Sequence, residues 1–149
     1  MLSKTCKYGI RAAAYVALKA SDGVKLSVKE IAKEVDAPEA FTGKILQLLN
    51  KQHIITSQKG PHGGFYVERF QLDQPIIHIV NAIDGMAIFQ ECGLGLRQCS
   101  EVHPCPMHAT FKVAREALLD VFQSTTLGQL AGGVKDGSSY INNALGADW

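Results

Sequence analysis

The sequence predicts a mainly α-helical fold with one small β-hairpin and one long helix toward its C-terminal end. Apolar residues recur at spacings of three and four in several separate segments, which is typical of amphipathic helices. Two β-rich runs flank a glycine-dense centre, which is the pattern of a hairpin. At 149 residues and 46% hydrophobic, the chain has the usual size of a single domain with one core.

Three helices are predicted in the N-terminal third. The first covers Thr5–Ala20 and packs on several sides. Ser27 and Glu30 stand at capping-box spacing, so a short helix is expected to start at Val28. Asp36 is expected to cap the next helix by accepting from its free N–H groups. The apolar positions of this third helix are Phe41, Ile45, Leu48 and Leu49.

The hairpin is predicted within Ile54–Val67, on either side of the glycine-dense segment that starts at Gly60. Two short helices joined by a tight turn, followed by such a hairpin, describe a winged helix-turn-helix DNA-binding module over residues 1–85. A plain helical bundle with an incidental hairpin is the alternative.

Charge is divided unequally along the chain. Residues 1–70 carry eleven Lys and Arg against six Asp and Glu, or +5, whereas residues 71–149 carry four against eight, or −4. A basic N-terminal part favours contact with a polyanion, because neutralised phosphates supply most non-specific affinity for nucleic acid. We therefore expect double-stranded DNA as a partner.

Candidate DNA contacts follow from the way such modules dock. The N-terminal turn of the recognition helix faces the major groove, where Glu39 and Thr42 are candidates for reading base edges. Lysines would neutralise phosphates, and glycines let the hairpin tip approach a backbone. Alternatively, Glu39 caps its helix, the lysines form a solvated face and His62 has no role. The candidates are Lys29, Lys33, Pro38, Glu39, Ala40, Thr42, Lys44, Lys51, Lys59, Gly60, His62 and Gly63.

Beyond the hairpin, a buried helix is predicted over Ile76–Ile83, and Met86–Glu101 shows little periodicity. A long helix should start between Pro104 and Pro106 and end near Ser124. Its two apolar stripes indicate contact with its own core and with a second subunit, so we expect a homodimer. We assign residues 86–106 to a cysteine-rich loop, 104–131 to the dimerisation helix and a short last helix, and 132–149 to a tail expected to be mobile.

The first twenty residues bear on location. Lys4, Lys7, Arg11 and Lys19 interrupt the apolar residues, so this segment is neither a signal peptide nor a membrane span. We expect a cytoplasmic protein without membrane contact, in which thiols stay reduced. No pairing of a nucleophile with a base stands out, and an enzyme is not expected.

Three of the four cysteines lie in one short stretch, which ends at His108. Cys92 and Cys99 are separated by six residues, and Cys99 and Cys105 by five, which is wider than zinc sites usually have. Thiolates at this spacing suit a loop wrapped around an iron–sulfur cluster. Cys105 and His108 lie three residues apart at a helix start, so both can face the same centre. Thiol redox sensing without metal, a zinc site and incidental cysteines are the alternatives. Cys6, His103 and Glu91 are alternatives to His108 as the fourth ligand.

The segment Ile31–Val67 resembles the DNA-binding half of the IscR, NsrR and CymR family of bacterial regulators. The hairpin tip Gly60-Pro-His-Gly-Gly-Phe65 is similar to the family's wing, G-P-G-G-G-Y. Lys4–Ala17 is similar to the family's first helix, and Asp84-Gly85 matches its usual D-G. The similarity covers roughly residues 2 to 130. It implies a dimeric, winged helix-turn-helix transcription regulator.

The cysteines imply the iron–sulfur branch of this family. Members with three cysteines at the positions of Cys92, Cys99 and Cys105 bind such a cluster, and His108 matches a cysteine-x-x-histidine arrangement among them. One extra residue between the first two cysteines leaves the cluster type open, with 2Fe-2S preferred and 4Fe-4S as the alternative. Some relatives use an acidic ligand from the partner's first helix, where this chain has Lys7. The implied function is sensing of redox state, nitric oxide or iron–sulfur status. The alternative is a cluster-free member that acts by thiol oxidation or by binding a metabolic enzyme.

Overall fold

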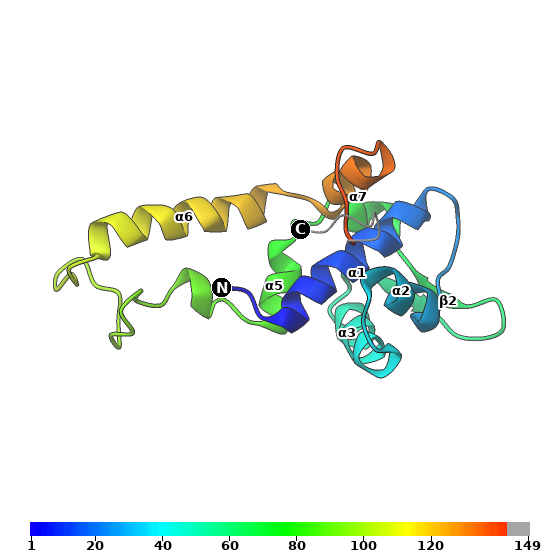
Figure 1. The fold of residues 1–149 in the computed structure, drawn as a ribbon, viewed down its shortest axis with the longest axis horizontal. Coiled ribbons are helices and arrows are strands. Elements are labelled where there is room, and N and C mark those ends of the chain that lie inside the picture. The colour runs from blue at the N-terminus through cyan, green and yellow to red at the C-terminus, as the bar shows by residue number, and fades with distance from the viewer. Residues whose placement is uncertain (143–149) are drawn as a thin grey trace, which may run out of the picture.

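Helix α1, Lys4–Ala20, is the element on which the body of the protein packs (Figure 1). The structure, a computed structural model, describes residues 1–142. Ser3 begins the helix, since its side chain accepts a hydrogen bond of 3.0 Å from the Cys6 N–H. Ala12, Ala13 and Ala14 are all buried, and such small side chains let neighbouring helices approach closely. The predicted first helix is confirmed to within one residue.

The helix-turn-helix pair consists of α2, Val28–Val35, and α3, Glu39–Lys51. Ser27 and Glu30 form the predicted capping box, and α2 begins at the predicted residue. The prediction that Asp36 caps α3 is wrong. Asp36 instead ends α2 in a left-handed conformation, φ 53°, which short polar residues tolerate. Its N–H bonds back to α2, and Pro38 takes the N-cap position of α3 without a side-chain hydrogen bond.

The predicted hairpin is present as the wing. Strands β1, Thr56–Gln58, and β2, Gly64–Tyr66, pair antiparallel, with Ser57 opposite Phe65. Leu26 pairs with Phe65 through two backbone hydrogen bonds of 2.8 and 2.9 Å, so the wing is joined to the chain before α2. A Cβ at Gly63 would lie 2.1 Å from the Gln58 carbonyl oxygen, which explains why the wing turn requires glycine there. The fold is therefore a winged helix.

A short helix that the sequence did not predict, α4 at Arg69–Leu72, follows the wing. Its buried side chain Gln71 accepts from the Thr56 hydroxyl at 3.0 Å and donates to the His53 carbonyl at 2.9 Å. These bonds tie the base of the wing to the end of α3. Gln71 is polar and gave no apolar signal in the sequence, because its contribution lies in satisfying buried backbone and hydroxyl groups.

The C-terminal half forms an arm that extends from the body (Figure 1). Helix α5, Ile77–Ile83, leads to a single 3-10 turn, η1 at Ala87–Phe89, and then to the cysteine-rich loop. The chain returns as α6, His108–Ser124, beside η1. Phe89 and Phe122 pack with ring centroids 5.8 Å apart, and with Cys6, Ile77 and Val80 they make a second small core at the base of the arm.

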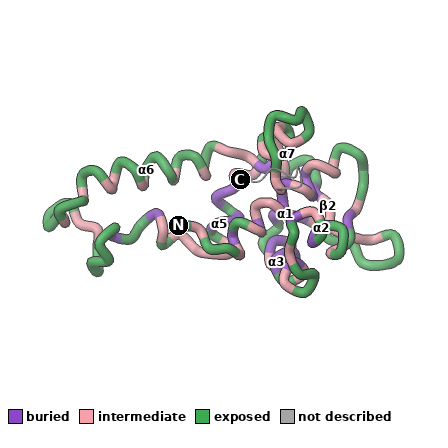
Figure 2. Tube along the Cα trace, in the orientation of Figure 1, coloured by how far each residue is buried: buried purple, intermediate pink, exposed green. Residues whose placement is uncertain are grey.

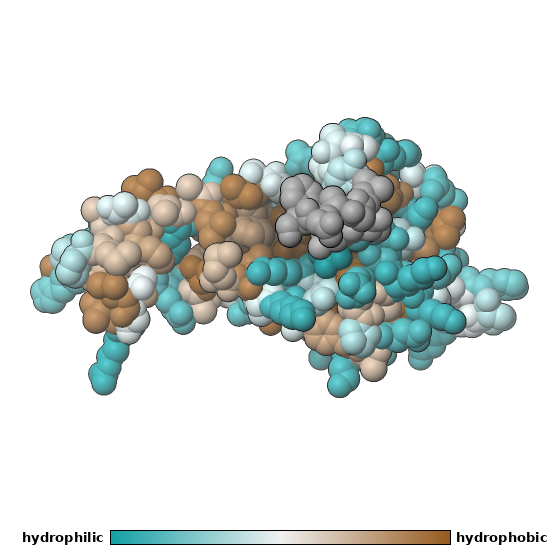
Figure 3. Space-filling view, in the orientation of Figure 1, coloured by the Kyte–Doolittle hydropathy of each residue, from teal (hydrophilic) through white to brown (hydrophobic). Residues whose placement is uncertain are grey.

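Helix α6 has the two predicted apolar stripes but no buried residue (Figure 2). One side of α6 faces the segment around η1. Its half-buried residues are Phe111, Leu119 and Phe122. Val113 is 67% exposed and Val121 54% exposed on another side. The space-filling view shows apolar surface along this arm (Figure 3). A 17-residue helix with no buried residue leaves an apolar face that a single chain does not cover.

The last helix, α7, runs from Leu127 to Lys135 and lies against α1. It continues beyond the predicted end at Ala131, through the first residues of the expected tail. The Ile141 carbonyl accepts from Arg11 on α1. The rest of that expectation concerns residues 143–149, which lie outside the described part of the chain. Within residues 1–142, no helix is both long enough and apolar enough to cross a membrane.

Candidate nucleic-acid interface and metal centre

The predicted DNA contacts on α2, α3 and the wing are accessible, with one exception. At the start of α3, Pro38, Glu39 and Ala40 are exposed to solvent. Lysines flank this turn from both helices and from the wing. The exposed predicted residues are Lys29, Lys33, Pro38, Glu39, Ala40, Lys44, Lys51, Lys59, Gly60 and His62, and Gly63 is half-buried.

Thr42 is the exception, and its predicted role in reading bases is wrong. Its side chain is 2% exposed and faces the core with Ile45 and Leu46. Thr42 is the fourth residue of α3, and its burial shows that it lies on the inward side of the helix. Its hydroxyl oxygen is buried and has no hydrogen-bond partner among residues 1–142. A buried polar group in this state lowers stability, typically by about 1–3 kcal/mol.

We expect Thr42→Val to raise the free energy of unfolding by about 1 kcal/mol, since valine keeps the branched shape and removes the unpaired hydroxyl. Chemical unfolding monitored by circular dichroism measures this change. Operator affinity should stay the same. If Thr42→Val is destabilised and also loses operator affinity, the hydroxyl is used and the buried placement is contradicted.

One basic feature beside α3 was missed by the sequence reasoning. Tyr8 of α1 packs edge-on against Phe41 in the first turn of α3, with ring centroids 5.6 Å apart and an interplanar angle of 84°. The Lys4 ammonium and the Arg11 guanidinium lie 5.8 and 5.3 Å from the centre of the Tyr8 ring. Positive charge from the start of α1 therefore stands next to the recognition helix. Only packing between two distant segments brings it there, so spacing along the sequence gave no signal.

The first cysteine of the loop is held by backbone N–H groups. Cys92 is 7% exposed. Hydrogen bonds from the N–H groups of Leu94 and Leu96 lower the pKa of the Cys92 thiol, with smaller contributions from the Cys105 side chain and the Gly95 N–H. The loop thus curls around the sulfur of Cys92 and favours its thiolate form. The Cys105 side chain is near enough to Cys92 to contribute to this lowering of the pKa.

The other two predicted ligands form a second pair. The Cys99 sulfur lies 3.4 Å from Nδ1 of His108, and His108 is the first residue of α6. Across residues 1–142, no three His, Cys, Asp or Glu side chains converge on one point. The four residues Cys92, Cys99, Cys105 and His108 therefore lie as two pairs in one loop.

This donor set fits an iron–sulfur cluster. Thiolates and imidazole are the ligands that such clusters take, and each iron of a two-iron cluster accepts two protein ligands. Two separate pairs suit that requirement. A structural zinc site instead needs four donors around a single ion, which the arrangement does not offer.

Helix α6 holds the cysteine-rich loop at two points. The Arg115 guanidinium donates to the Glu91 carbonyl at 2.8 Å, just before Cys92. Lys112 forms an ion pair with Glu101, between the second and third cysteines. These contacts fix the loop to the helix that carries the exposed apolar face.

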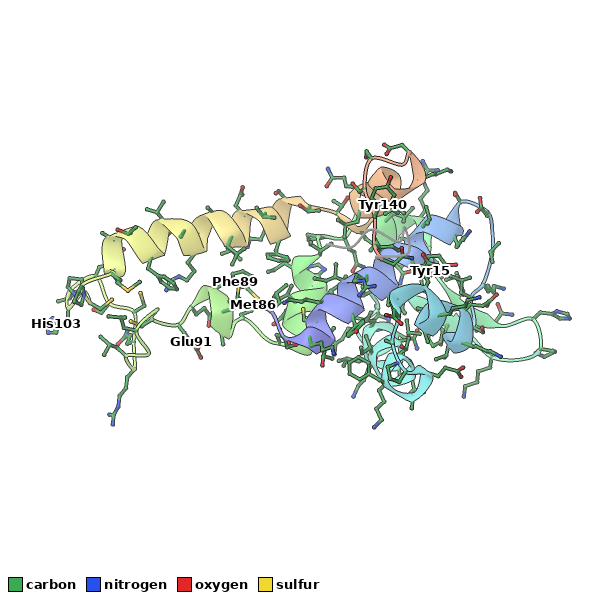
Figure 4. All side chains as sticks on the ribbon, viewed as in Figure 1. Tyr15, Met86, Phe89, Glu91, His103 and Tyr140 are labelled. Atoms are coloured by element: carbon green, nitrogen blue, oxygen red, sulfur yellow. The ribbon has the colours of Figure 1, made fainter. Side chains whose placement is uncertain are left out.

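The alternative fourth ligands are less suitable. Cys6 is fully buried in the second core, where burial and then the nearby Asp84 carboxylate raise the pKa of its thiol to about 12. Its expected role as a buried core cysteine is confirmed. His103 lies at the tip of the arm, and Glu91 lies near η1 rather than at that tip (Figure 4). Both are exposed.

Comparison with known proteins identifies the family. The model of Rrf2, described as an iron-dependent transcriptional regulator, matches residues 2–133. The chain belongs to the Rrf2 family. A protein of Aquifex aeolicus named as an HTH-type transcriptional regulator is 32% identical over 132 residues, which is 87% of this chain and 90% of that protein. Protein rrf2 of Nitratidesulfovibrio vulgaris is 27% identical over 143 residues, or 96% of this chain and 93% of that protein.

Solved structures show the same fold. CymR, the global cysteine regulator of B. subtilis, aligns with a TM-score of 0.71 at 21% identity, covering 89% of this chain and 96% of its own. IscR of T. potens aligns with a TM-score of 0.71 at 19% identity, covering 93% and 91%. This member of the Rrf2 family is a transcriptional regulator with a winged-helix fold, and the Aquifex aeolicus relative and CymR are also named as regulators.

Proposed function

We propose that this Rrf2 protein is a homodimer that binds a double-stranded DNA operator, and that an iron–sulfur cluster sets its operator affinity. Cys92, Cys99, Cys105 and His108 hold the cluster, for which 2Fe-2S is preferred. The observation that carries the proposal is the contact of 3.4 Å between the Cys99 sulfur and Nδ1 of His108, in the same loop as Cys92 and Cys105. The exposed apolar face of α6 supplies the dimer contact.

DNA binding by α3 and the wing is supported by the side chains they expose. Glu39 and Ala40 are free to approach base edges in the major groove. Lys29, Lys33 and Lys44 are exposed on α2 and α3, where phosphates would lie. The wing tip adds Lys59 and His62, from a turn that glycines allow to come close to a backbone.

Salt dependence tests the DNA contacts. We expect Lys44→Ala to weaken operator and non-operator DNA about equally, and to reduce the slope of log affinity against log salt by about 1, because one phosphate contact is lost. Fluorescence anisotropy with labelled duplexes at several salt concentrations measures both quantities. Lys19→Ala, which removes a charge from the last turn of α1, is the matched control and should leave the slope unchanged. Equal slopes for all three proteins, or no salt dependence, would contradict the assignment.

A chain of contacts supports coupling between the loop and α3. Asp84, at the end of α5, accepts from the Ser3 N–H at 2.7 Å and from the Ser3 hydroxyl. Ser3 caps α1, and Tyr8 of α1 packs against Phe41 at the start of α3. The Tyr8 hydroxyl also donates to the Asp36 carbonyl at 3.4 Å, in the turn before α3. Ordering of the loop can therefore shift the recognition helix through one rigid helix.

The cluster supplies a redox-active, negatively charged group when bound. The chain's own residues favour it by lowering the pKa of Cys92 and by fixing the loop to α6 through Arg115. A ligand shifts such an equilibrium only by its differential affinity for the two states. The loop must therefore hold the cluster more tightly in one arrangement of the dimer than in the other.

A second candidate is thiol sensing without a cluster, and the contact between Cys92 and Cys105 favours it. The lowered pKa of the Cys92 thiol favours its thiolate form, which is the form that an oxidant attacks. Oxidation by hydrogen peroxide would then join both sulfurs in a disulfide and release two molecules of water. Mass spectrometry of protein purified without air, before and after peroxide, separates the two candidates: iron and sulfide bound beforehand support the cluster, and a loss of two hydrogens in metal-free protein supports the disulfide.

A further inference from the structure

A cavity of about 300 Å³ lies on the body of the protein, away from the cysteine-rich loop. It opens to solvent and is lined by the C-terminal end of α1, by the chain that leaves the wing and by α7, which packs over α1 (Figure 1). Leu18, Val67 and Leu72 contribute apolar wall. On α7, Gly132 leaves the cavity open, since a Cβ added there would meet nothing within 4 Å. The volume is at the lower end of the range for small-molecule pockets, about 300–1,000 Å³.

Two cations stand at the edge of this apolar cavity. Arg69 of α4 and Lys135 of α7 both line it, and no acidic side chain of the described residues does. Within residues 1–142, neither cation forms an ion pair. The Lys135 ammonium donates to the Ser21 hydroxyl at 3.1 Å, which holds it at the cavity. Asp136 follows Lys135, but its carboxylate accepts from Ser138, whose hydrogen bonds lower the pKa of that carboxyl.

We propose that this cavity binds a small monocarboxylate with an unbranched apolar chain. The carboxylate of the ligand lies between Arg69 and Lys135, and its hydrocarbon chain lies along the apolar wall toward Gly132. An arginine fork and an ammonium match a carboxylate, whereas a neutral ligand would supply no counter-charge to either cation. The bound molecule bridges the segment that leaves the wing and α7. It therefore adds an effector site that depends on neither the cysteines nor the DNA contacts.

Titration of the purified full-length protein with octanoate tests this proposal. We expect saturable binding by isothermal calorimetry and a matching rise in the melting temperature, since a ligand that binds only the folded state stabilises it. Affinity should rise by up to about fourfold for each methylene from butanoate to octanoate, as each group is buried. Octan-1-ol has the same chain without the charge, and it should bind at least about tenfold more weakly.

Two variants distinguish the contribution of the ligand's hydrocarbon chain from that of its carboxylate. Gly132→Leu fills the cavity from a helical position with free space, so octanoate binding should be lost while the melting temperature without ligand is kept or raised. Arg69→Ala should weaken octanoate about tenfold and leave octan-1-ol unchanged. Lys19→Ala removes a charge from the same end of α1, outside the cavity lining, and should have no effect on either ligand.

Three results would overturn the proposal: no saturable binding of octanoate, affinity independent of chain length, or unchanged affinity in Gly132→Leu. If Arg69→Ala lowers operator affinity while octanoate fails to bind, the cation belongs to the DNA surface instead. The three binding results that would overturn the proposal involve neither iron nor DNA. The effector site can therefore fail while the proposed regulator function stands, and the reverse.

Discussion

Val121→Glu is expected to convert the protein to a monomer and to lower its affinity for a two-half-site operator by at least about a hundredfold. Val121 is 54% exposed on α6. Leu118, which is 38% exposed, and Val113, which is 67% exposed, belong to the same apolar face. A helix with no buried residue needs a partner for this face, and a carboxylate placed within it would have to be desolvated. Losing one of two linked recognition helices removes the gain from simultaneous binding, which is about 10²–10⁴-fold.

Sedimentation velocity gives the oligomeric state, and anisotropy with full and half operators gives the affinity. The control is Gln123→Glu, which adds the same charge two residues away, on the polar side of the same helix. It should stay dimeric and keep its operator affinity. A dimeric Val121→Glu variant with unchanged affinity would show that the exposed face of α6 is not the subunit contact.

Cys99→Ala is expected to remove the bound iron and, with it, the dependence of operator affinity on the cluster. Cys99 lies against His108, so its loss leaves only an imidazole in that pair. In the intact protein, operator affinity should differ between the cluster-loaded and cluster-free states by about 5–150-fold, the usual range for coupled sites. In the variant the two preparations should bind equally. Iron analysis and anaerobic anisotropy measure the two effects.

Cys6→Ala is the matched control for this experiment, because it also removes one thiol. Cys6 is buried in the second core and its thiol has a pKa raised to about 12, so it is a poor source of thiolate. This variant should keep its iron and its coupling, with some loss of stability from the lost packing. Iron retained in Cys99→Ala but lost in Cys6→Ala would reverse the assignment of the two cysteines.

Local signals predicted most of the helices and the wing. The capping box at Ser27 and Glu30 placed the start of α2 at the correct residue, because the device is complete within four residues. The wing was predicted from glycines whose positions the turn requires, as at Gly63. Family resemblance added the identity of the family, which the match over residues 2–133 confirms.

The errors arose where packing decides the outcome. Asp36 has the residue type of a helix N-cap, yet it ends α2 in a left-handed conformation because its N–H bonds to the carbonyls of Ala32 and Lys33. Thr42 stands in the right turn for DNA contact but on the wrong side of it. The α1 cations beside Phe41 could not be found from spacing at all, since the residues are about thirty positions apart.

The metal centre was predicted as a set of residues, not as an arrangement. The spacing of the cysteines pointed to a loop around a cluster, and the structure places the Cys99 sulfur against His108 and the Cys105 side chain near Cys92. This division depends on the curl of the backbone from Leu94 to Leu96, which no periodicity in the sequence describes. The cluster itself stays a proposal.

Chemical analysis of protein purified without air tests the cluster most directly. Iron and acid-labile sulfide should be present in equal amounts, about two of each per chain, as a 2Fe-2S cluster requires. The unmodified protein should be coloured and should give an electron paramagnetic resonance signal after one-electron reduction. The Cys99→Ala variant should be colourless, and the Cys6→Ala variant should keep the colour. A colourless protein without iron or sulfide, or one with a single zinc ion per chain, would contradict the account.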